Sequence, residues 1–304
     1  MSTAVAFSSY GGPEVLEAIE IEPPRPASGQ VIVRVESAGV QPFDVRVRRG
    51  DLRRWVPVSF PQVLGNEFAG VIEEVGPDAG AFEVGDGVIG FTTMRAYAEF
   101  VVAGVDGIVP KPPSMPWEEA GVLSAAGQTA HIALSELEVG EGDTVLVHAA
   151  AGGVGTFAVQ LAREWGATVI GTASERNHDY LRHLGAYPVA YGPGLGERVR
   201  KLAPHGVDAA LDAIGGEAIL VSLELVGNKN RVGTIADHAG AAKYGVSTLG
   251  GMRTAGRLEE LVELYERGRL RVHIQNAYPL RDAPRAHREV EAGHVRGKVV
   301  LVVG

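Results

Sequence analysis

A glycine-rich turn between a short apolar segment and a helical segment constrains the fold of this chain more than any other feature. Residues 144–148 are a run of Val and Leu closed by a polar residue, which predicts a strand buried on both faces, as in a parallel sheet. From Val154 the apolar residues follow a helical period, which predicts a helix packed on that sheet. The members of this apolar stripe are Val154, Ala158, Leu161, Ala162 and Trp165.

The turn itself has the composition of a phosphate-binding loop and reads AAGGVG over residues 150–155. Glycine lets the backbone turn sharply and approach a ligand, and the N–H groups and dipole at a helix start favour an anion. The alternative is a glycine turn that only packs closely, since Ala150 stands where the usual motif has its first glycine. The strands and helices that follow favour a dinucleotide site, formed by Ala151, Gly152, Gly153, Val154 and Gly155.

Composition narrows the class of protein. The 304 residues suffice for about two domains, and 45% hydrophobic with 21% charged residues is ordinary for a globular chain. A net charge of −9 argues against a general surface for nucleic acid or anionic membranes. No apolar run is long enough to span a bilayer and no signal peptide is evident, so we expect a cytoplasmic protein. The absence of cysteine excludes disulfides, thiol chemistry and thiolate zinc sites.

The order of expected strands and helices along the chain predicts an α/β protein with two domains. Residues 1–119 contain short strands punctuated by Gly and Pro, which indicates a partly closed barrel. Residues 120–254 alternate strand and helix, which indicates a doubly wound parallel sheet that ends with a strand over 244–249. Residues 255–304 resemble the first part again and are expected to complete it. The strands and helix expected outside the parallel sheet include 31–35, 68–75, 86–90, 96–102, 258–267, 270–277 and 298–303.

Seven short segments carry a recognisable pattern along the whole chain. They are residues 10–16, 39–44, 64–71, 84–88, 126–130, 145–162 and 293–300. In this order they resemble the medium-chain dehydrogenase/reductase superfamily, specifically its zinc-less quinone oxidoreductase (zeta-crystallin-like) branch. The resemblance implies a GroES-like catalytic domain, a Rossmann domain, a cleft between them and NADPH as cofactor. It also places Thr129 among the cofactor-binding residues.

The resemblance allows a metal site to be weighed. Zinc-dependent relatives carry Cys where Gln41 lies and His where Asn66 lies, and they have a four-cysteine lobe that is missing here. No two of the nine histidines form a close i, i+4 pair or a cluster on one helix face, so scattered surface or cap histidines are expected. We therefore predict no metal, and carbonyl polarisation by side-chain donors and bound water. The histidines concerned include His131, His148, His178, His183 and His205.

The choice of cofactor is read at the end of the second strand of the parallel sheet. NAD enzymes usually have a carboxylate there that holds the ribose 2′-hydroxyl. Aligned on the glycine turn, that position is Ser174, and Arg176 follows as a fork donor for a 2′-phosphate. Two alternatives remain: Ser174 is only an N-cap beside a solvated Arg176, or Glu175 is the missing acid one position late. We predict NADPH, with Ser174 and Arg176 on its 2′-phosphate.

The catalytic residues are carried over from the resembled family position by position. Its Asn-Pro-x-Asp loop, followed by Tyr or Lys, has Gln41 for the Asn, keeps Asp44, and has Arg46 for the Tyr or Lys. Arg46 is a permanent cation able to steady an enolate, with Gln41 and Asn66 as further donors. A guanidinium does not act as an acid near neutrality, so the proton would come from water. The alternative is a solvated basic loop, since residues 46–54 contain five arginines.

These observations predict an NADPH-dependent reductase of quinones or α,β-unsaturated carbonyls that works by metal-independent hydride transfer. A carbonyl or alcohol dehydrogenase and a non-catalytic NADPH-binding protein, with a crystallin-like or sensor role, remain alternatives. Turnover of simple quinones and enones separates the last from the first. We also expect a homodimer, because the strand over 244–249 would be an edge strand and two-fold symmetry lets identical edges pair.

The cofactor assignment predicts that Arg176→Ala weakens NADPH binding roughly 10–150-fold and NADH binding little. A charge-assisted hydrogen bond contributes about 1.5–3 kcal/mol, which corresponds to that range of affinity. Titration calorimetry with the two cofactors measures the difference. Equal losses for both cofactors would contradict the assignment.

Overall fold

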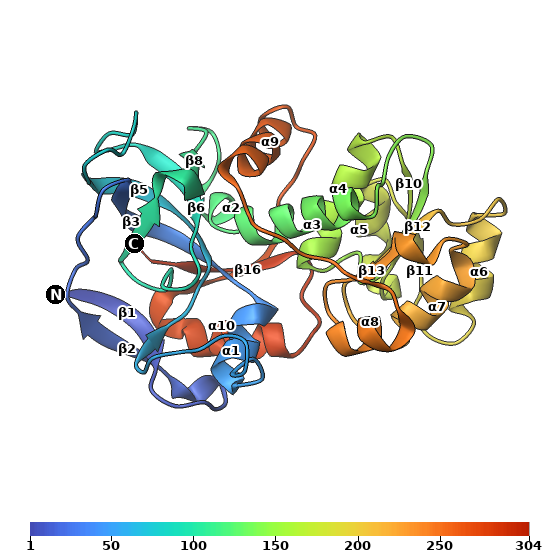
Figure 1. Ribbon diagram of the computed structural model, residues 1–304, viewed down its shortest axis with the longest axis horizontal. Helices are drawn as coiled ribbons and strands as arrows, with labels where there is room; N and C mark the ends of the chain where they lie inside the picture. Colours follow the sequence, from blue (N-terminus) through green and yellow to red (C-terminus); the bar gives the residue numbers. More distant parts are fainter. Residues whose placement is uncertain (304) are drawn as a thin grey trace. The chain divides into compact units, whose positions relative to one another are not determined.

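The computed structural model describes residues 1–303, which divide into two compact units (Figure 1). Unit 1 comprises residues 1–125, 253–266 and 272–303, and unit 2 comprises residues 126–252 and 267–271. The boundaries predicted from the sequence lie after residues 119 and 254. Unit 1 is β-rich, and unit 2 is built on a parallel sheet. Among the described residues, no helix has the length and apolar character needed to cross a membrane.

Unit 1 contains two sheets. The larger has the order β15-β16-β3-β5-β6-β8, with β7 also paired to β3, and the smaller has the order β2-β1-β4. Their strands are β1 (Ser2–Phe7), β2 (Leu16–Ile21), β3 (Gln30–Val40), β4 (Gln62–Val63), β5 (Glu67–Val75), β6 (Gly87–Phe91), β7 (Phe100–Gly104), β8 (Ile108–Pro110), β15 (Ile274–Pro279) and β16 (Lys298–Val302).

The eleven residues of β3 form the spine of the larger sheet. It pairs antiparallel with β5, β7 and β16, and its apolar residues Val31, Val33 and Val35 are fully buried. The partner β16 comes from the end of the chain, with Val299 opposite Val40 and Val302 opposite Ser37. The polypeptide therefore returns to unit 1 to complete its sheet, where β16 pairs with β3 on one side and with β15 on the other.

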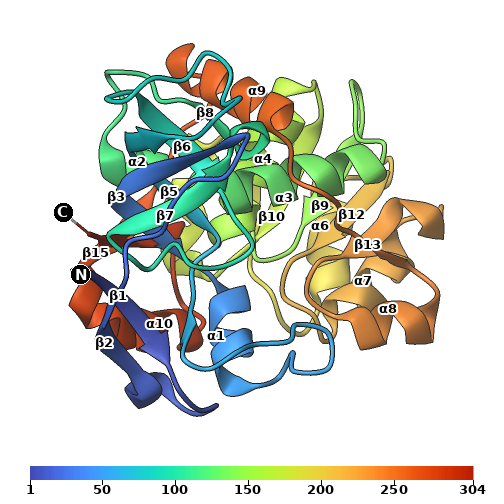
Figure 2. The same cartoon turned by 60° about the vertical axis from the view of Figure 1, so that its left-hand side comes forward.

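Two helices of unit 1 were not expected from the sequence. The segment after Val40 is helix α1 (Pro42–Arg49) and not a loop. Its signals are local: Pro42 opens the helix, Gln41 and Asp44 form a reciprocal capping box, and Gly50 ends it with a φ of +81°. Its apolar pattern is too short to predict a helix by periodicity alone. Helix α10 (Ala283–Glu291) packs beside it (Figure 1, Figure 2).

Two expected strands of unit 1 begin later in the chain than predicted. The strand placed over 96–102 is β7, which starts at Phe100, and Ala98 makes only an isolated bridge to Ala4. The strand placed over 270–277 is β15, which starts at Ile274. In both cases apolar residues before the strand are buried without entering a ladder, so hydrophobicity overstates the strand. The other helices of this unit are α2 (Trp117–Ala120) and α9 (Ala255–Glu266).

Unit 2 is a six-stranded sheet of order β11-β10-β9-β12-β13-β14, parallel throughout. The order reverses at β9, as in doubly wound folds, which confirms the predicted fold class. The elements are α3 (Ser124–Glu136), β9 (Thr144–Val147), α4 (Gly153–Glu164), β10 (Thr168–Thr172), α5 (His178–His183), β11 (Tyr187–Val189), α6 (Leu195–Leu202), β12 (Ala209–Asp212), α7 (Ala218–Leu225), β13 (Val232–Thr234), α8 (His238–Tyr244) and β14 (Ser247–Thr248).

Helix α4 is more deeply buried than the sequence predicts. Every residue from Gly155 to Ala162 is buried, including the polar Thr156 and Gln160, so the helix has no solvent face over this length. Gln160 receives a hydrogen bond from the Arg271 backbone N–H at 2.8 Å and donates one to the Arg271 carbonyl at 3.0 Å. A segment remote in sequence thus covers the face that the apolar stripe leaves polar.

The expected edge strand is the other departure in unit 2. Only Ser247 and Thr248 of the predicted 244–249 strand belong to β14, and Tyr244 ends helix α8. The helix begins at an Asp237 N-cap and ends at Gly245 with a φ of +69°. Because the helix and its glycine cap extend to Gly245, the strand begins only at Ser247. Strand β14 still lies at the edge of the sheet, next to β13.

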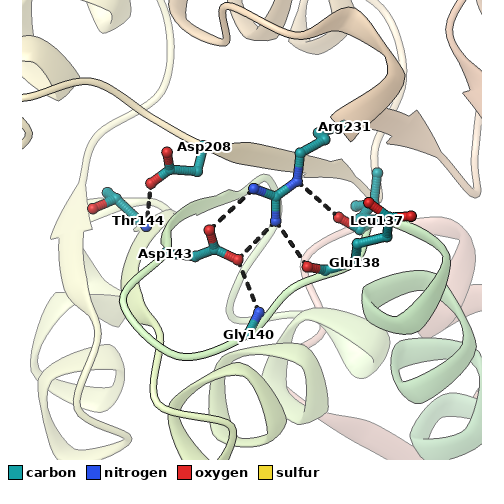
Figure 3. Close-up of polar contacts among 7 residues, drawn as sticks. All are labelled: Leu137, Glu138, Gly140, Asp143, Thr144, Asp208 and Arg231. Atoms are coloured by element: carbon teal, nitrogen blue, oxygen red, sulfur yellow. Dashed lines mark hydrogen bonds and ion pairs between the residues drawn. The ribbon is translucent and has the colours of Figure 1, made fainter.

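An arginine clamp ties together the end of the sheet where the strands begin (Figure 3). Arg231, which directly precedes β13, donates to both carboxylate oxygens of Asp143 at 3.0 and 2.7 Å and to the carbonyls of Leu137 and Glu138. Asp143 directly precedes β9, and the paired guanidinium lowers the pKa of its carboxyl. The clamp joins the starts of two strands to the segment after α3, so its role is structural.

Buried histidines predict how the stability of the protein depends on pH. Burial lowers the pKa of His287 to about 3 and that of His148 to about 4. Burial also raises the pKa of Asp44 to about 6, which works in the opposite direction. As the pH falls from about 6.5 to 4, the unfolded chain takes up protons on both histidines that the folded chain does not, so stability is lost. Asp44 offsets part of this loss below pH 6.

We expect the thermal midpoint of unfolding to drop between pH 6.5 and 4.5, and His148→Gln to flatten this dependence. Because burial lowers the pKa of His148 to about 4, its share of the lost stability approaches roughly 3 kcal/mol at the acid end. Scanning calorimetry of the wild type and the variant at both pH values tests this, with exposed His205→Gln as the control. An unchanged pH slope in His148→Gln would contradict it.

Candidate active site

The glycine turn and the end of β10 lie against each other in unit 2. The backbone N–H of Ala149 donates to the Thr172 hydroxyl at 3.1 Å, and that of Ala150 donates to the Thr172 carbonyl at 3.0 Å. Ala149 has a φ of +52°, a conformation that favours glycine. The strained residue turns the chain away from β9 toward the start of α4. The ends of two parallel strands therefore meet at the predicted nucleotide site.

The start of α4 fits a phosphate group. Its N-cap is Gly152, in extended conformation with a φ of −80°, and no side chain caps the helix. The first N–H groups of an α-helix have no partner within the helix, and together with the helix dipole they favour an anion. Gly155 serves packing instead, because a Cβ there would lie 2.3 Å from the Ala149 carbonyl oxygen. The turn thus combines an open anion site with close contact between strand and helix.

The predicted 2′-phosphate residues follow directly on β10. Ser174 is half-buried and accepts a hydrogen bond from the Asn177 side chain at 3.3 Å, whereas Glu175 and Arg176 are exposed. A short 3-10 helix, Glu175–Asn177, follows β10 at the carboxyl end of the parallel strands, which is also where the glycine turn lies. Thr129 lies on α3, half-buried.

Two further polar groups stand at the ends of neighbouring strands and were missed in the sequence. Asp212 closes β12 and accepts hydrogen bonds from the backbone N–H groups of Ile214 and Gly215 and from the Thr234 hydroxyl at 2.6 Å. His148, expected on the surface or at a cap, is instead buried and 3.0 Å from the Ser222 hydroxyl. Both follow an apolar strand directly, and this position at the carboxyl end of a parallel strand is the signal that identifies them.

In unit 1, Gln41 belongs to a buried cluster with two charged residues. Its Oε1 accepts a hydrogen bond from the Lys298 ammonium at 2.7 Å, and its Nε2 donates to Glu67. Lys298 Nζ and Glu67 Oε1 are 3.1 Å apart, and the Ala125 backbone N–H donates to the other Glu67 oxygen at 2.6 Å. The exposed fractions are 8% for Gln41, 4% for Lys298 and 0% for Glu67. The amide therefore lies between a cation and an anion.

Asp44 fixes the backbone around this cluster. Its carboxylate accepts hydrogen bonds from the N–H of Gln41 at 2.9 Å, the N–H of Gly65 at 3.2 Å and the Tyr97 hydroxyl at 3.2 Å. The Tyr97 hydroxyl is also 3.3 Å from Nε2 of His287 on α10. The chain Asp44–Tyr97–His287 is wholly buried, and it links the start of α1 to the segment before β5.

Asn66 lies between the Gly65 and Glu67 contacts and is buried with 9% exposed. Its side-chain Oδ1 has no hydrogen-bond partner among the described residues. Arg253 donates to the Asn66 backbone carbonyl at 2.8 Å and to the Thr92 carbonyl at 3.1 Å, with its guanidinium 5.0 Å from the centre of the Phe91 ring. Because an unpaired buried amide oxygen is costly, it marks a position where a ligand or water completes the hydrogen bonding.

The arginines of residues 46–54 have different environments, so the segment is not a uniformly solvated loop. Arg48 is completely buried and pairs with Glu291 of α10. Arg49 is exposed, 3.4 Å from Asp51. Arg46 is half-buried on the last turn of α1, and Arg53 and Arg54 are exposed after it. Arg46, Arg48 and Arg49 also complement the negative end of the helix dipole.

Unit 1 also contains a cavity of about 490 Å³. It is lined by the segment after β6, the segment before β4 and the edge of β7, and its lining includes Thr92, Thr93 and Met94. Gln41, Asn66 and Lys298 are not among its lining residues. The cavity is therefore separate from the buried cluster around Gln41.

Comparison with known proteins matches two family descriptions to the chain. Residues 27–113 match the alcohol dehydrogenase GroES-like domain, and residues 184–301 match the zinc-binding dehydrogenase domain. The quinone oxidoreductase of Pseudomonas aeruginosa is 32% identical over 99% of this chain and 100% of its own length. The mouse quinone oxidoreductase is 30% identical over 99% of this chain and 97% of its own length.

Solved structures agree with the sequence relatives. The Escherichia coli quinone oxidoreductase complexed with NADPH superposes with a TM-score of 0.88, at 27% identity over 99% of this chain and 100% of its own. The mycobacterial Rv1454c complexed with NADPH also gives 0.88, at 31% identity over the full length of both chains. A GroES-like unit with a parallel dinucleotide-binding sheet defines a medium-chain dehydrogenase/reductase. Within this superfamily, the chain belongs to the quinone oxidoreductase branch, and it is an oxidoreductase with a nicotinamide cofactor.

The name of one matched domain raises the question of zinc, and the residues of the cluster do not fit that metal. Gln41 and Asn66 offer amide oxygens, and the one carboxylate, Glu67, is already paired with the Lys298 ammonium. Zinc in proteins is bound by Cys, His and carboxylate ligands. Among residues 1–303, no group of three or more His, Cys, Asp or Glu side chains is suited to a metal ion.

Glu67 and Lys298 are the main residues of the cluster that sequence reasoning missed. Each is a charged residue directly followed by an apolar run, Glu67 at the start of β5 and Lys298 at the start of β16. A charged residue rarely lies within a buried strand unless it is paired. That signal is present in the sequence, but the pairing of two positions so distant in the chain is not.

The donor set predicts that the purified protein carries no stoichiometric zinc and that chelators leave its activity unchanged. Elemental analysis of protein purified without chelator, followed by assay after EDTA treatment, tests this. Activity that is lost with the chelator and restored by zinc would overturn the prediction.

Proposed function

We propose that the protein is an NADPH-dependent reductase of quinones or α,β-unsaturated carbonyls that works without a metal. The observation that carries the proposal is the cluster around Gln41, where hydrogen-bond donors and a buried cation stand in place of metal ligands. The relatives described as quinone oxidoreductases support the quinone half. A structure described as the CurK enoyl reductase, at 27% identity and a TM-score of 0.90, supports the enone half.

The reaction balances as a two-electron reduction. NADPH, when bound, would supply the hydride that reduces an enone at its β-carbon or reduces a quinone. In the substrate, the C=C electron pair would become the enolate double bond and the carbonyl π pair would move onto the oxygen. The resulting enolate or hydroquinone anion would take a proton from water. The task of the protein is to hold donors at that oxygen, because charge develops there in the transition state. Arg46, Gln41 and Asn66 are the residues that we assign to this task.

NADPH is proposed over NADH on the residues that follow β10. Ser174 and Arg176 stand where a 2′-phosphate would need a neutral donor and a fork donor, and they share an edge of the sheet with the glycine turn. The solved relatives complexed with NADPH support the same choice. Ala151, Gly152, Gly153, Val154 and Gly155 would hold the pyrophosphate, and Thr129 is retained as a cofactor-binding residue.

Two other proposals follow from the sequence. We propose a homodimer, supported by the edge position of β14 next to β13. We also propose a cytoplasmic location. A zinc-independent carbonyl or alcohol dehydrogenase is the less favoured activity, because the Lys298 ammonium is already engaged by Gln41 and Glu67 and the Arg46 guanidinium does not give up a proton near neutrality. A non-catalytic NADPH-binding protein is the remaining alternative, and an assay with simple quinones and enones separates it from the proposed function.

The proposed role of Arg46 predicts that Arg46→Ala lowers turnover of an enone or a quinone about 100–1,000-fold, the usual cost of one oxyanion donor. NADPH affinity should change little. Steady-state assays with quinones, enones and saturated ketones measure this, with Arg49→Ala as the control because Arg49 is exposed on the same turn of α1.

Two results would count against the proposal. If Arg46→Ala keeps full activity on every accepted substrate, the catalytic donor lies elsewhere. If the wild type reduces saturated ketones but neither enones nor quinones, conjugate reduction is wrong.

A further inference from the structure

Lys298, near the end of the chain, places a buried ammonium in the candidate active site. Lys298 opens β16, and the pairing of Val299 with Val40 sets it beside the end of β3, where Gln41 follows. Its Nζ donates to Gln41 Oε1 at 2.7 Å and lies 3.1 Å from Glu67 Oε1. The side chains of Lys298 and Glu67 are 3% and 0% exposed.

Stability alone is a weak reason for this ion pair. Removing two charges from water is costly, and apolar replacements of buried pairs are often neutral or stabilising. Glu67 is nevertheless fully engaged, since it accepts from the Ala125 N–H at 2.6 Å and from Gln41 Nε2 in addition to Lys298. The pair is therefore built around the Gln41 amide, which is its shared neutral partner.

The cluster gives the Gln41 amide a single orientation. With Oε1 facing an ammonium and Nε2 facing a carboxylate, the flipped amide would set like groups against each other. An amide nitrogen carries two hydrogens, and Glu67 takes one of them. The second N–H remains for a substrate oxygen. A cation on Oε1 also draws charge from the amide and strengthens its N–H as a donor, because linked hydrogen bonds polarise one another.

We propose that Lys298, together with Glu67, positions and polarises Gln41 as the donor to the carbonyl oxygen of the substrate. The inference rests on the proposed function, which makes Gln41 a donor. Lys298 and Glu67 do not touch the substrate, so they are positioning residues. The buried ammonium acts on the developing negative charge only through the amide, because its own charge is paired with Glu67.

A double-mutant cycle tests the inference by kinetics. The double variant Lys298→Met/Glu67→Gln removes both charges at nearly constant volume, which avoids leaving one buried charge unpaired. We expect it to lower kcat about tenfold or more for an accepted enone or quinone, with the Kd for NADPH unchanged. In a Gln41→Ala background the same pair of changes should produce no further loss of kcat, because the pair would act only through the amide.

A matched control removes an ion pair outside the site. Arg231→Met/Asp143→Asn abolishes the arginine clamp of unit 2 (Figure 3). It is expected to lower the thermal midpoint without the coupling to Gln41 that the cycle measures. If Lys298→Met/Glu67→Gln reduces kcat equally with and without Gln41, the pair acts independently of the amide and the inference is overturned.

A readout without turnover separates this inference from the proposed function. In selectively ¹⁵N-glutamine-labelled protein, the side-chain NH₂ signals of Gln41 are identified by their absence in Gln41→Ala. We expect slow hydrogen exchange at these signals in the wild type and fast exchange in Lys298→Met/Glu67→Gln. Fast exchange in the wild type would overturn the inference. Slow exchange in a protein that reduces neither enones nor quinones would support the held amide and reject the proposed function.

Discussion

The pairing of β16 with β3 is the interaction on which the candidate active site depends. β3 is the central strand of unit 1, and its end carries Gln41 and helix α1. Only the last strand of the chain can bring Lys298 to that end, through a register in which Val299 lies opposite Val40. A one-residue slip would turn every side chain of β16 to the other face of the sheet. The apolar residues Val299 and Leu301, both buried in the core, therefore fix the position of the ammonium.

The position of the polar cluster depends on the apolar sheet beneath it, and the same holds for the candidate cofactor site in unit 2. There the parallel pairing of β9 and β10 sets the glycine turn against Thr172 and brings Ser174 to the same edge. In both units an apolar ladder sets the position of polar groups at its end. The apolar residues thus occupy the middle of each sheet, and the polar groups lie at the strand ends, where backbone N–H and C=O groups are free to bind ligands.

The buried network of Asp44, Tyr97 and His287 holds the remaining side of the site. It joins three segments distant in the chain, and every member is fully buried. Burial opposes charge on each of them: it raises the pKa of Asp44, raises that of Tyr97 and lowers that of His287. The network keeps the start of α1 in place, and with it the backbone of Gln41. Protonation of His287 at low pH would place a charge in this buried network and disturb its contact with the Tyr97 hydroxyl.

The sequence by itself determined what depends on local order. The run of Val and Leu before AAGGVG specifies strand, turn and helix, and the capping residues Gln41, Asp44 and Gly50 of α1 are equally local, although an eight-residue helix carries too little periodicity to reveal itself. The tertiary structure decided which remote residues meet. Nothing local in LGNEFAG or GKVVLVV indicates that Glu67 and Lys298 pair, and nothing in the sequence around Arg48 indicates that it turns inward to Glu291. Those contacts follow from strand register and helix packing, which depend on the summed burial of apolar residues along the whole chain and not on any one segment.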